Sequence, residues 1–221
     1  MAIVASDFHG NVSKCRRFLE HKPEEEHVFA GDAVDSYNES AESQLKVLNM
    51  LLDSSCVLLF GNHELSYHRK HRMECSGRHY TGMQTFPTLL DNPRWKLAHV
   101  ADDYLITHAG VSEKHVFRYN SINNLAKRIN KDLAKKTNGV FDVGFCRGGF
   151  KSCGGPLWFD FRFDHPGLSQ KFNQVFGHCS LQEPWEDKSN VCHHVCINSH
   201  DSSNDLWMFD TKTKQIIVDK G

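Results

Sequence analysis

Three short apolar runs, each followed directly by polar and glycine residues, most constrain the fold of this chain. The runs cover residues 2–5, 28–30 and 57–60, and each is too short and too β-rich for a core helix. Stretches with helical periodicity, residues 12–20 and 39–52, separate the runs. The order strand, helix, strand, helix, strand predicts parallel strands with right-handed crossovers, which defines an α/β fold.

The segments that follow the three runs carry polar side chains that can bind metal ions or take part in catalysis. They read Asp7-Phe8-His9-Gly10, Gly31-Asp32-Ala33-Val34-Asp35 and Gly61-Asn62-His63-Glu64. In an open α/β sheet, the loops at the carboxyl ends of the strands gather at one place. We therefore expect carboxylate, amide and imidazole groups to converge there. That mixture of oxygen and nitrogen ligands suits a site for two divalent metal ions.

The rest of the chain predicts further elements of one domain that spans residues 1–221. Residues 66–90 and 111–155 interrupt the pattern, and we interpret them as cap insertions, the second with a charged helix at 121–136 and a glycine-rich loop from 144. We expect strands at 95–99 and 104–107, joined as a hairpin around Asp102-Asp103, and at 174–176, 191–198, 206–210 and 215–218.

Composition narrows the class of protein. A chain of 221 residues can bury one substantial core, and its net charge of −1 argues against nucleic-acid binding by bulk electrostatics. We find no signal peptide and no apolar stretch long enough to cross a bilayer. The eight cysteines form no Cys-x-x-Cys pair, so no structural zinc site is indicated. We expect reduced thiols and a cytoplasmic protein, in the host cytoplasm if the source is viral.

Two later histidine motifs complete a recognisable series. His108-Ala109-Gly110 and Gly177-His178 each follow a short apolar strand. With the three earlier segments they make five ordered blocks over residues 7–178, and this order resembles the calcineurin-like metallophosphoesterases. The serine/threonine phosphoprotein phosphatases, including their small phage and bacterial relatives, are the branch that the blocks resemble most.

The resemblance implies a fold and a set of metal ligands. The fold would be a four-layer α/β/β/α sandwich with two mixed central sheets and a small helical or loop cap. The first metal would be held by Asp7, His9 and Asp32, and the second by Asp32, Asn62, His108 and His178. His193 or His194 would replace His178 if the alignment shifts. The ions would be manganese, with iron or zinc as alternatives.

The resemblance also implies a mechanism. Two ions about 3.5–4 Å apart would share a hydroxide that attacks phosphorus directly, without a phosphoenzyme. In the family, the residue at His63 donates a proton to the leaving oxygen, and the carboxylate at Asp35 orients it. We expect a structural role for Glu64 at the start of a helix.

One position departs from the phosphoprotein phosphatase pattern. That pattern places an arginine directly after Asp35, where this chain has Ser36. Because a phosphate group favours a guanidinium partner, we expect another arginine to take its place. We favour Arg162, which follows Leu157-Trp158, and consider Arg147 next; Arg69, Arg72 and Arg78 are weaker candidates.

These features support three hypotheses about function. The first is a metal-dependent phosphatase for phosphate monoesters, with phosphoserine and phosphothreonine in proteins as candidate substrates. The second is a dinucleoside polyphosphate (Ap4A-type) hydrolase or a phosphodiesterase that uses the same metals. The third is a non-catalytic phosphate- or nucleotide-binding module. The expected partner is a phosphorylated substrate (phosphoprotein, nucleotide or small phosphoester), with no membrane and no obligate protein partner.

Overall fold

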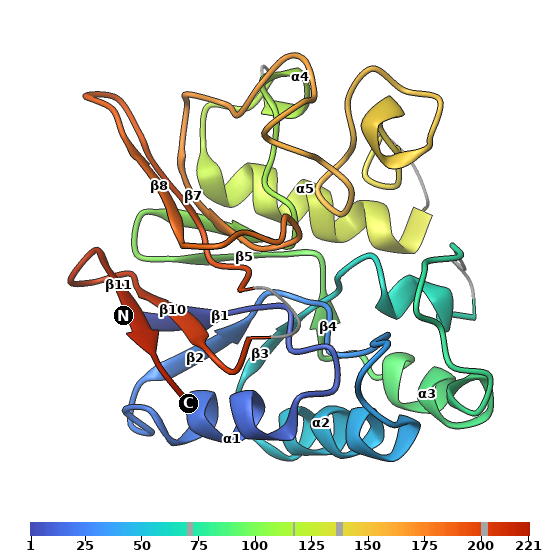
Figure 1. Ribbon diagram of the computed structural model, residues 1–221. Coiled ribbons are helices and arrows are strands. Elements are labelled where there is room, and N and C mark those ends of the chain that lie inside the picture. The colour runs from blue at the N-terminus through green and yellow to red at the C-terminus, as the bar shows by residue number, and fades with distance from the viewer. Residues whose placement is uncertain (70–72, 117, 136–138, 200–202) are drawn as a thin grey trace.

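Two β-sheets lie face to face between two layers of helices (Figure 1). The structure is a computed structural model that describes residues 1–69, 73–116, 118–135, 139–199 and 203–221. The layers follow the order α/β/β/α, and both sheets mix parallel with antiparallel strands. The predicted four-layer sandwich with two mixed sheets is therefore confirmed.

The first sheet contains the three apolar runs that open the chain. Its strands follow the order β11-β10-β1-β2-β3-β4, with β1 at Ala2–Ala5, β2 at Glu26–Phe29, β3 at Val57–Leu59, β4 at Trp95–Lys96, β10 at Leu206–Asp210 and β11 at Gln215–Asp219. Strands β1 to β4 are parallel, whereas β10 pairs antiparallel with β1 and β11. The parallel pairing of β1, β2 and β3 confirms the predicted parallel strands.

The second sheet is built from later parts of the chain. Its order is β5-β6-β7-β9-β8, with β5 at Ala98–Ala101, β6 at Tyr104–Thr107, β7 at Asn173–Phe176, β8 at Trp185–Lys188 and β9 at His193–Cys196. Strands β6, β7 and β9 are parallel. Strands β5 and β6 form the predicted hairpin, whose turn contains Asp102 and Asp103.

Helices cover the outer face of each sheet (Figure 1). Helices α1 (Val12–Glu20), α2 (Ala41–Asp53) and α3 (Gly82–Leu90) lie beneath the first sheet, while α4 (Glu113–Val116) and α5 (Ile122–Lys135) lie beyond the second. Asn11 caps α1, because its side chain accepts a hydrogen bond from the backbone N–H of Lys14 at 2.9 Å. Helix α3 belongs to the segment 66–90 and packs beside α2. The division into a domain and caps stays a prediction.

The alternation of side chains along the strands builds two cores. Ile3, Phe29 and Leu58 point toward the helices below the first sheet, and their neighbours Val4, Val28 and Leu59 point into the space between the sheets. All six are fully buried. Since each such side chain contributes about 1.5–3 kcal/mol when buried, both faces of the first sheet are strongly fixed.

Two elements differ from the sequence-based expectation. The predicted strand at 95–99 is wrong, because the chain changes sheets at Leu97. Strand β4 ends in the first sheet at Lys96, and β5 begins in the second at Ala98. The side chain of Asn130 accepts hydrogen bonds from Leu97 and Ala98 and supports this change. Strand β8 was not predicted, since Glu186, Asp187 and Lys188 give this exposed edge strand no apolar alternation.

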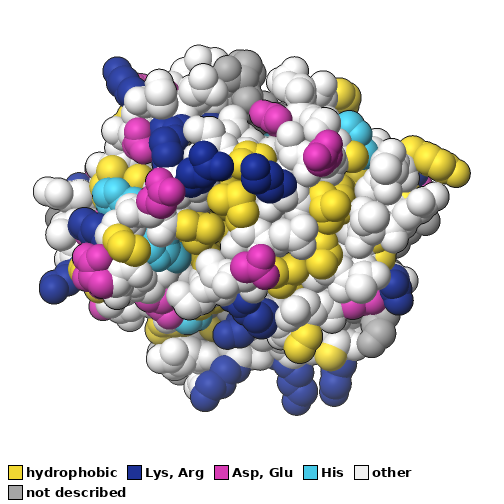
Figure 2. Space-filling model, turned by 90° about the horizontal axis from the view of Figure 1, so that it is seen from below, with side chains coloured by type: hydrophobic (Ala, Val, Ile, Leu, Met, Phe, Trp, Pro, Cys, Tyr) yellow, Lys and Arg dark blue, Asp and Glu magenta, His cyan; other side chains and the backbone are white. Residues whose placement is uncertain are grey.

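The face of the molecule seen from below in Figure 2 does not separate its charges into large fields. The face below helices α1, α2 and α3 mixes basic, acidic and hydrophobic side chains (Figure 2). This agrees with the net charge of −1. The described helices are each too short or too polar to span a lipid bilayer.

Candidate metal centre

The loops at the carboxyl ends of strands from both sheets meet at one place. Asp7 and His9 follow β1, Asp32 follows β2, and Asn62 follows β3. His108 follows β6 and His178 follows β7 of the second sheet. Backbone hydrogen bonds join the loops, from Asp7 N to Gly31 O at 2.8 Å and from Gly177 N to His108 O at 2.7 Å. The site therefore depends on the packing of one sheet against the other.

Asp7, His9 and Asp32 form the first of two ligand clusters. They are buried, and each offers a ligand atom within 4.8 Å of the others. The Nδ1 atom of His9 donates to the backbone oxygens of Val34 and Asp35, at 2.9 and 2.8 Å. Because Nδ1 carries the proton, Nε2 can offer its lone pair to a metal ion. Nε2 lies 3.9 Å from Asp7 Oδ1 and 3.9 Å from Asp32 Oδ2.

Asp32, His108 and His178 form the second cluster, and Asn62 lies within it. His108 Nε2 lies 2.9 Å from Asn62 Oδ1, 3.2 Å from His178 Nδ1 and 3.2 Å from Asp32 Oδ2. Asn62 Oδ1 and His178 Nδ1 are 2.8 Å apart. Asp32 Oδ2 thus faces both clusters, since it also lies 3.9 Å from His9 Nε2.

When His108 is neutral, these contacts bring electron pairs together rather than donors with acceptors. His108 Nδ1 donates to the backbone oxygen of Ala30 at 2.9 Å, so its Nε2 presents a lone pair to the oxygens of Asn62 and Asp32. Burial disfavours a charged imidazole, but the nearby Asp32 carboxylate outweighs it and raises the pKa of His108 to about 9. A pocket of lone pairs that attracts a proton this strongly also attracts a metal cation.

The other buried groups also fit metal ligation. Burial and the charge of Arg147 hold the pKa of His178 well below its usual range, which keeps the imidazole neutral as a ligand requires. His178 Nε2 is buried and has no hydrogen-bond partner among the described residues. Burial opposes ionisation of Asp32, yet the adjacent His108 and His63 keep its pKa far below normal. The residues present therefore suit divalent cations.

Glycine is required at two positions that press against the carboxylates. A Cβ atom on Gly61 would lie 2.0 Å from Asp32 Oδ1, and one on Gly177 would lie 2.0 Å from Asp7 Oδ2. Either contact is far below a van der Waals separation, so a side chain at either position would displace a carboxylate.

His63 and Asp35 lie together at the edge of the clusters. His63 Nδ1 is 3.2 Å from Asp35 Oδ2, and its Nε2 is 4.0 Å from Asp32 Oδ2. Burial disfavours the charged form of His63, but the carboxylates of Asp32 and Asp35 outweigh this and raise its pKa to about 9. The arrangement can hold a proton on the side of His63 that faces Asp32.

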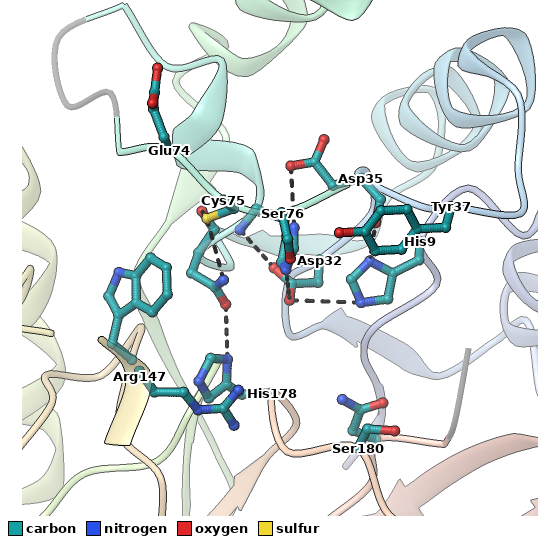
Figure 3. Close-up of a pocket in the computed structure, with 14 residues that line it drawn as sticks. His9, Asp32, Asp35, Tyr37, Glu74, Cys75, Ser76, Arg147, His178 and Ser180 are labelled. Atoms are coloured by element: carbon teal, nitrogen blue, oxygen red, sulfur yellow. Dashed lines mark hydrogen bonds and ion pairs between the residues drawn. The ribbon is translucent and has the colours of Figure 1, made fainter. Parts of the chain in front are cut away.

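A cavity of about 420 Å³ opens over these groups (Figure 3). Its lining residues include His9, Asp32, Asp35, Tyr37, Asn62, His63, Glu74, Cys75, Ser76, Arg147, Trp158, His178, Ser180 and Asn198. In Figure 3 the guanidinium of Arg147 extends toward His178, from the side opposite Tyr37. The cavity can therefore present a cationic group to a ligand that sits over the clusters.

Residues 2–219 match the family model described as calcineurin-like phosphoesterase. The chain belongs to the calcineurin-like phosphoesterase family. Membership in the calcineurin-like phosphoesterases implies hydrolysis of phosphoester bonds at a binuclear metal centre. No curated protein matches the chain in sequence.

Solved structures of other proteins share the fold at low sequence identity. A cold-active protein-tyrosine phosphatase of Shewanella sp. has a TM-score of 0.61 at 17% identity, over 98% of this chain and 76% of that chain. A protein serine/threonine phosphatase from Saccharomyces cerevisiae has a TM-score of 0.55 at 14% identity, with coverages of 99% and 78%. A putative diadenosine tetraphosphatase has a TM-score of 0.54 at 17% identity, with coverages of 100% and 93%.

Within this calcineurin-like phosphoesterase, the structure places the arginine candidates differently from the sequence-based expectation. Arg162 does not line the cavity, and it pairs with Asp160 through two nitrogens at 2.9 and 2.7 Å. Arg147 does line the cavity, and its Nη2 lies 2.9 Å from the same Asp160 carboxylate. Arg69 and Arg78 pair with Asp91 and Glu74, and Arg72 lies outside the described residues.

Ser36 does not substitute for the missing arginine. Its hydroxyl accepts from the backbone N–H groups of Asn38 and Glu39, at 3.1 and 3.2 Å, and closes a turn. The alternative ligands to His178 also lie elsewhere: His193 contacts Tyr104 and Glu186, and His194 bonds the backbone of Ser169.

Two residues that shape the site, Asn198 and Tyr67, were not predicted, whereas a structural role for Glu64 at the start of a helix was. Asn198 Nδ2 donates to Asp7 Oδ1 at 2.8 Å. The hydroxyl of Tyr67 bonds Asp35 Oδ1. Glu64 begins a short 3-10 helix, and its carboxylate accepts from the backbone N–H groups of Asp32, Ala33 and Gly61, at 2.9, 2.7 and 2.7 Å. Asn198 and Tyr67 pair with residues far away in the chain, so no local pattern in the sequence could have revealed these contacts.

Proposed function

We propose that this protein is a binuclear metal-dependent phosphoesterase that hydrolyses phosphate monoesters by direct attack of water. The observation that carries the proposal is the pair of buried clusters that share Asp32. Asp7, His9 and Asp32 would hold one ion, and Asp32, Asn62, His108 and His178 the other. Mixed oxygen and nitrogen ligation suits manganese, which we propose, and also iron or zinc.

Two bound ions supply an activated water and neutralise charge on the phosphoryl group. His63 would donate a proton to the leaving oxygen, and Asp35 would orient the imidazole through the hydrogen bond to Nδ1. Arg147 would bind a phosphoryl oxygen in the role expected of Arg162. The Asp160 carboxylate forms ion pairs with both Arg147 and Arg162. Because two guanidinium groups share one carboxylate, the cluster keeps a net positive charge beside the cavity.

The geometry supports attack by water rather than by a covalent nucleophile. Cys75 is the one cysteine among the described residues that line the cavity. Burial raises the pKa of the Cys75 thiol to about 12, so it carries almost no thiolate at neutral pH. Its sulfur also lies 3.1 Å from the backbone oxygen of Asn62, which fixes the thiol proton there.

Phosphorylated proteins are the substrate class we propose first. The shared fold with two protein phosphatases, of the tyrosine and the serine/threonine kind, supports it. A dinucleoside polyphosphate substrate is the alternative, supported by the putative diadenosine tetraphosphatase, of which the match covers 93%. The cavity is partly open to solvent and can admit a group attached to the phosphate in either case.

A substrate panel tests the proposal. Purified protein with added manganese should hydrolyse p-nitrophenyl phosphate and phosphopeptides, and more slowly bis-p-nitrophenyl phosphate and diadenosine tetraphosphate. The variants Asp32→Asn and His63→Asn should lose at least about a hundredfold in kcat, because they remove a shared ligand and the proton donor. Preference for diadenosine tetraphosphate would favour the alternative. Binding of phosphate esters without turnover under manganese, iron or zinc would favour a non-catalytic module and refute the enzyme.

A further inference from the structure

The two oxygens of the Asp35 carboxylate have different partners. Oδ2 accepts from Nδ1 of His63 at 3.2 Å, and Oδ1 accepts from the hydroxyl of Tyr67 in a shorter contact. Asp35 is 3% exposed and Tyr67 is 2% exposed, so water does not compete for either bond. Because a terminal carboxylate rotates easily, a second donor on Oδ1 fixes the plane in which Oδ2 meets His63.

The proton of Tyr67 has one direction available. The backbone N–H of His79 donates to the Tyr67 oxygen at 2.8 Å, so that oxygen acts as an acceptor there and the hydroxyl proton points to Asp35. The Tyr67 ring packs edge-on against Phe86 of α3, with centroids 4.9 Å apart. The position of the hydroxyl is therefore fixed both by the packing of the ring and by the hydrogen bond to its oxygen.

The same part of the chain binds the backbone next to Asp35. His79 Nε2 donates to the backbone oxygen of Ser36 at 2.9 Å. On the other side, Gln44 Oε1 accepts from the backbone N–H of Asp35 at 3.0 Å. Asp35 has a positive φ of 62°, which is uncommon for a residue with a side chain. Such a conformation persists only where neighbouring groups hold it.

We propose that Tyr67 is a positioning residue for proton donation to the leaving group, acting on His63 through Asp35. This inference rests on the phosphoesterase function proposed above. As the oxygen of the attacking water bonds to phosphorus, the bond from phosphorus to the ester oxygen breaks, and the ester oxygen keeps the electron pair of that bond. His63 Nε2 gives the ester oxygen a proton, and the proton released by the attacking water restores the one on His63. Asp35 accepts the hydrogen bond from His63 Nδ1 and keeps Nε2 directed at the cavity, and Tyr67 keeps Asp35 in place.

The dependence of rate on the leaving group tests this role. The variant Tyr67→Phe keeps the ring and removes only the hydroxyl. With manganese bound, its kcat for phenyl phosphate should fall about tenfold more than its kcat for p-nitrophenyl phosphate, because p-nitrophenolate needs little protonation to leave. KM for both substrates should change little, since Tyr67 does not line the cavity.

Tyr104→Phe is the matched control. Tyr104 is also fully buried, and its hydroxyl forms a hydrogen bond with His193 Nδ1 at 2.6 Å. Both residues lie in the second sheet and outside the cavity. This variant should keep the wild-type ratio of the two rates. If Tyr67→Phe lowers both rates equally, with unchanged metal content, its role is structural and the proposal is wrong.

Two further variants keep the test decisive. In an Asp35→Asn background, Tyr67→Phe should have no further effect on the ratio, because its route to His63 is already broken. If Tyr67→Phe does not fold, His79→Ala removes the partly exposed imidazole that bonds the backbone oxygen of Ser36 beside Asp35, and it should shift the ratio in the same direction by a smaller factor. An unchanged ratio in an active His79→Ala protein would then overturn the proposal. Wild-type protein inactive on both esters would instead refute the phosphoesterase function itself.

Discussion

Single residues at the candidate metal centre adopt backbone conformations that their surroundings must sustain. Five of the eight described non-glycine residues with positive φ belong to it: Asp7, His9, Asp32, Asp35 and His178. Each such residue costs about 1–3 kcal/mol. The clustering of this strain marks where the chain gives up local stability to place ligand atoms.

Arg147 allows a prediction at this scale. Arg147→Gln should reduce kcat/KM for p-nitrophenyl phosphate by about ten- to a hundredfold, because a charge-assisted hydrogen bond to a phosphoryl oxygen contributes about 1.5–3 kcal/mol. Steady-state kinetics with manganese present measures the change.

Arg162→Gln is the matched comparison for Arg147→Gln. Arg162 shares the Asp160 carboxylate but lies outside the cavity, so its loss should affect kcat/KM less. A larger loss for Arg162→Gln than for Arg147→Gln would return the phosphate-binding role to Arg162.

The sequence predicted the ligand candidates at the residue scale better than their supports. Asp7, Asp32 and Asn62 stand directly after strands, and parallel strands bring their carboxyl ends together. Arg147 lies on a glycine-rich loop, and no periodicity relates it to the cavity. Tyr67 likewise reaches Asp35 across 32 positions in the chain, through a fold that local patterns do not encode.

Among the elements, the hairpin of β10 and β11 depends on one buried carboxylate. Asp210 ends β10, and its oxygens accept from Lys22 Nζ at 2.8 Å and from the backbone N–H groups of Lys212 and Thr213 at 3.0 and 3.1 Å. Burial opposes ionisation, but the hydrogen bonds from Lys22 and the two backbone groups lower the pKa of Asp210.

This lowered pKa predicts a pH-dependent stability. A carboxyl whose pKa is lower in the folded state stabilises the fold above its unfolded pKa of about 3.9 and loses that effect as pH falls through the folded value. Asp210→Asn should therefore destabilise the protein by about 1 kcal/mol at pH 7, and the difference from wild type should shrink below about pH 4.

Urea unfolding of the two proteins across this pH range measures the effect. A difference in the free energy of unfolding that stays constant from pH 7 to pH 3 would contradict the assigned role of Asp210.

The sequence also predicted elements unevenly. Helices α1 and α2 and strands β1, β2 and β3 were confirmed, because periodicity and capping residues such as Asn11 mark them locally. The residues 95–101 divide between two sheets at Leu97, which depends on a side chain from α5. Strand β8 is held by pairing with β9 rather than by burial of its own side chains. Tertiary contacts determine both the division at Leu97 and strand β8, so the local sequence pattern could not predict them.

At the scale of the whole molecule, the second ligand cluster exists only when the two sheets pack together. Asp32 and Asn62 come from the first sheet, and His108 and His178 come from the second. Figure 1 places the two sheets that carry these loops face to face. The metal centre is therefore complete only when the two sheets have packed together. Bound metal should for this reason stabilise the whole fold.

The stoichiometry of metal-dependent activity tests the central claim most directly. Chelator-stripped protein is titrated with manganese while elemental analysis counts bound ions and the rate of p-nitrophenyl phosphate hydrolysis is followed. We predict that activity saturates at two ions per chain, and that Asp32→Asn, which alters the shared ligand, binds fewer ions and loses activity. Saturation without hydrolysis, or hydrolysis that persists in stripped protein, would contradict a binuclear metallophosphoesterase.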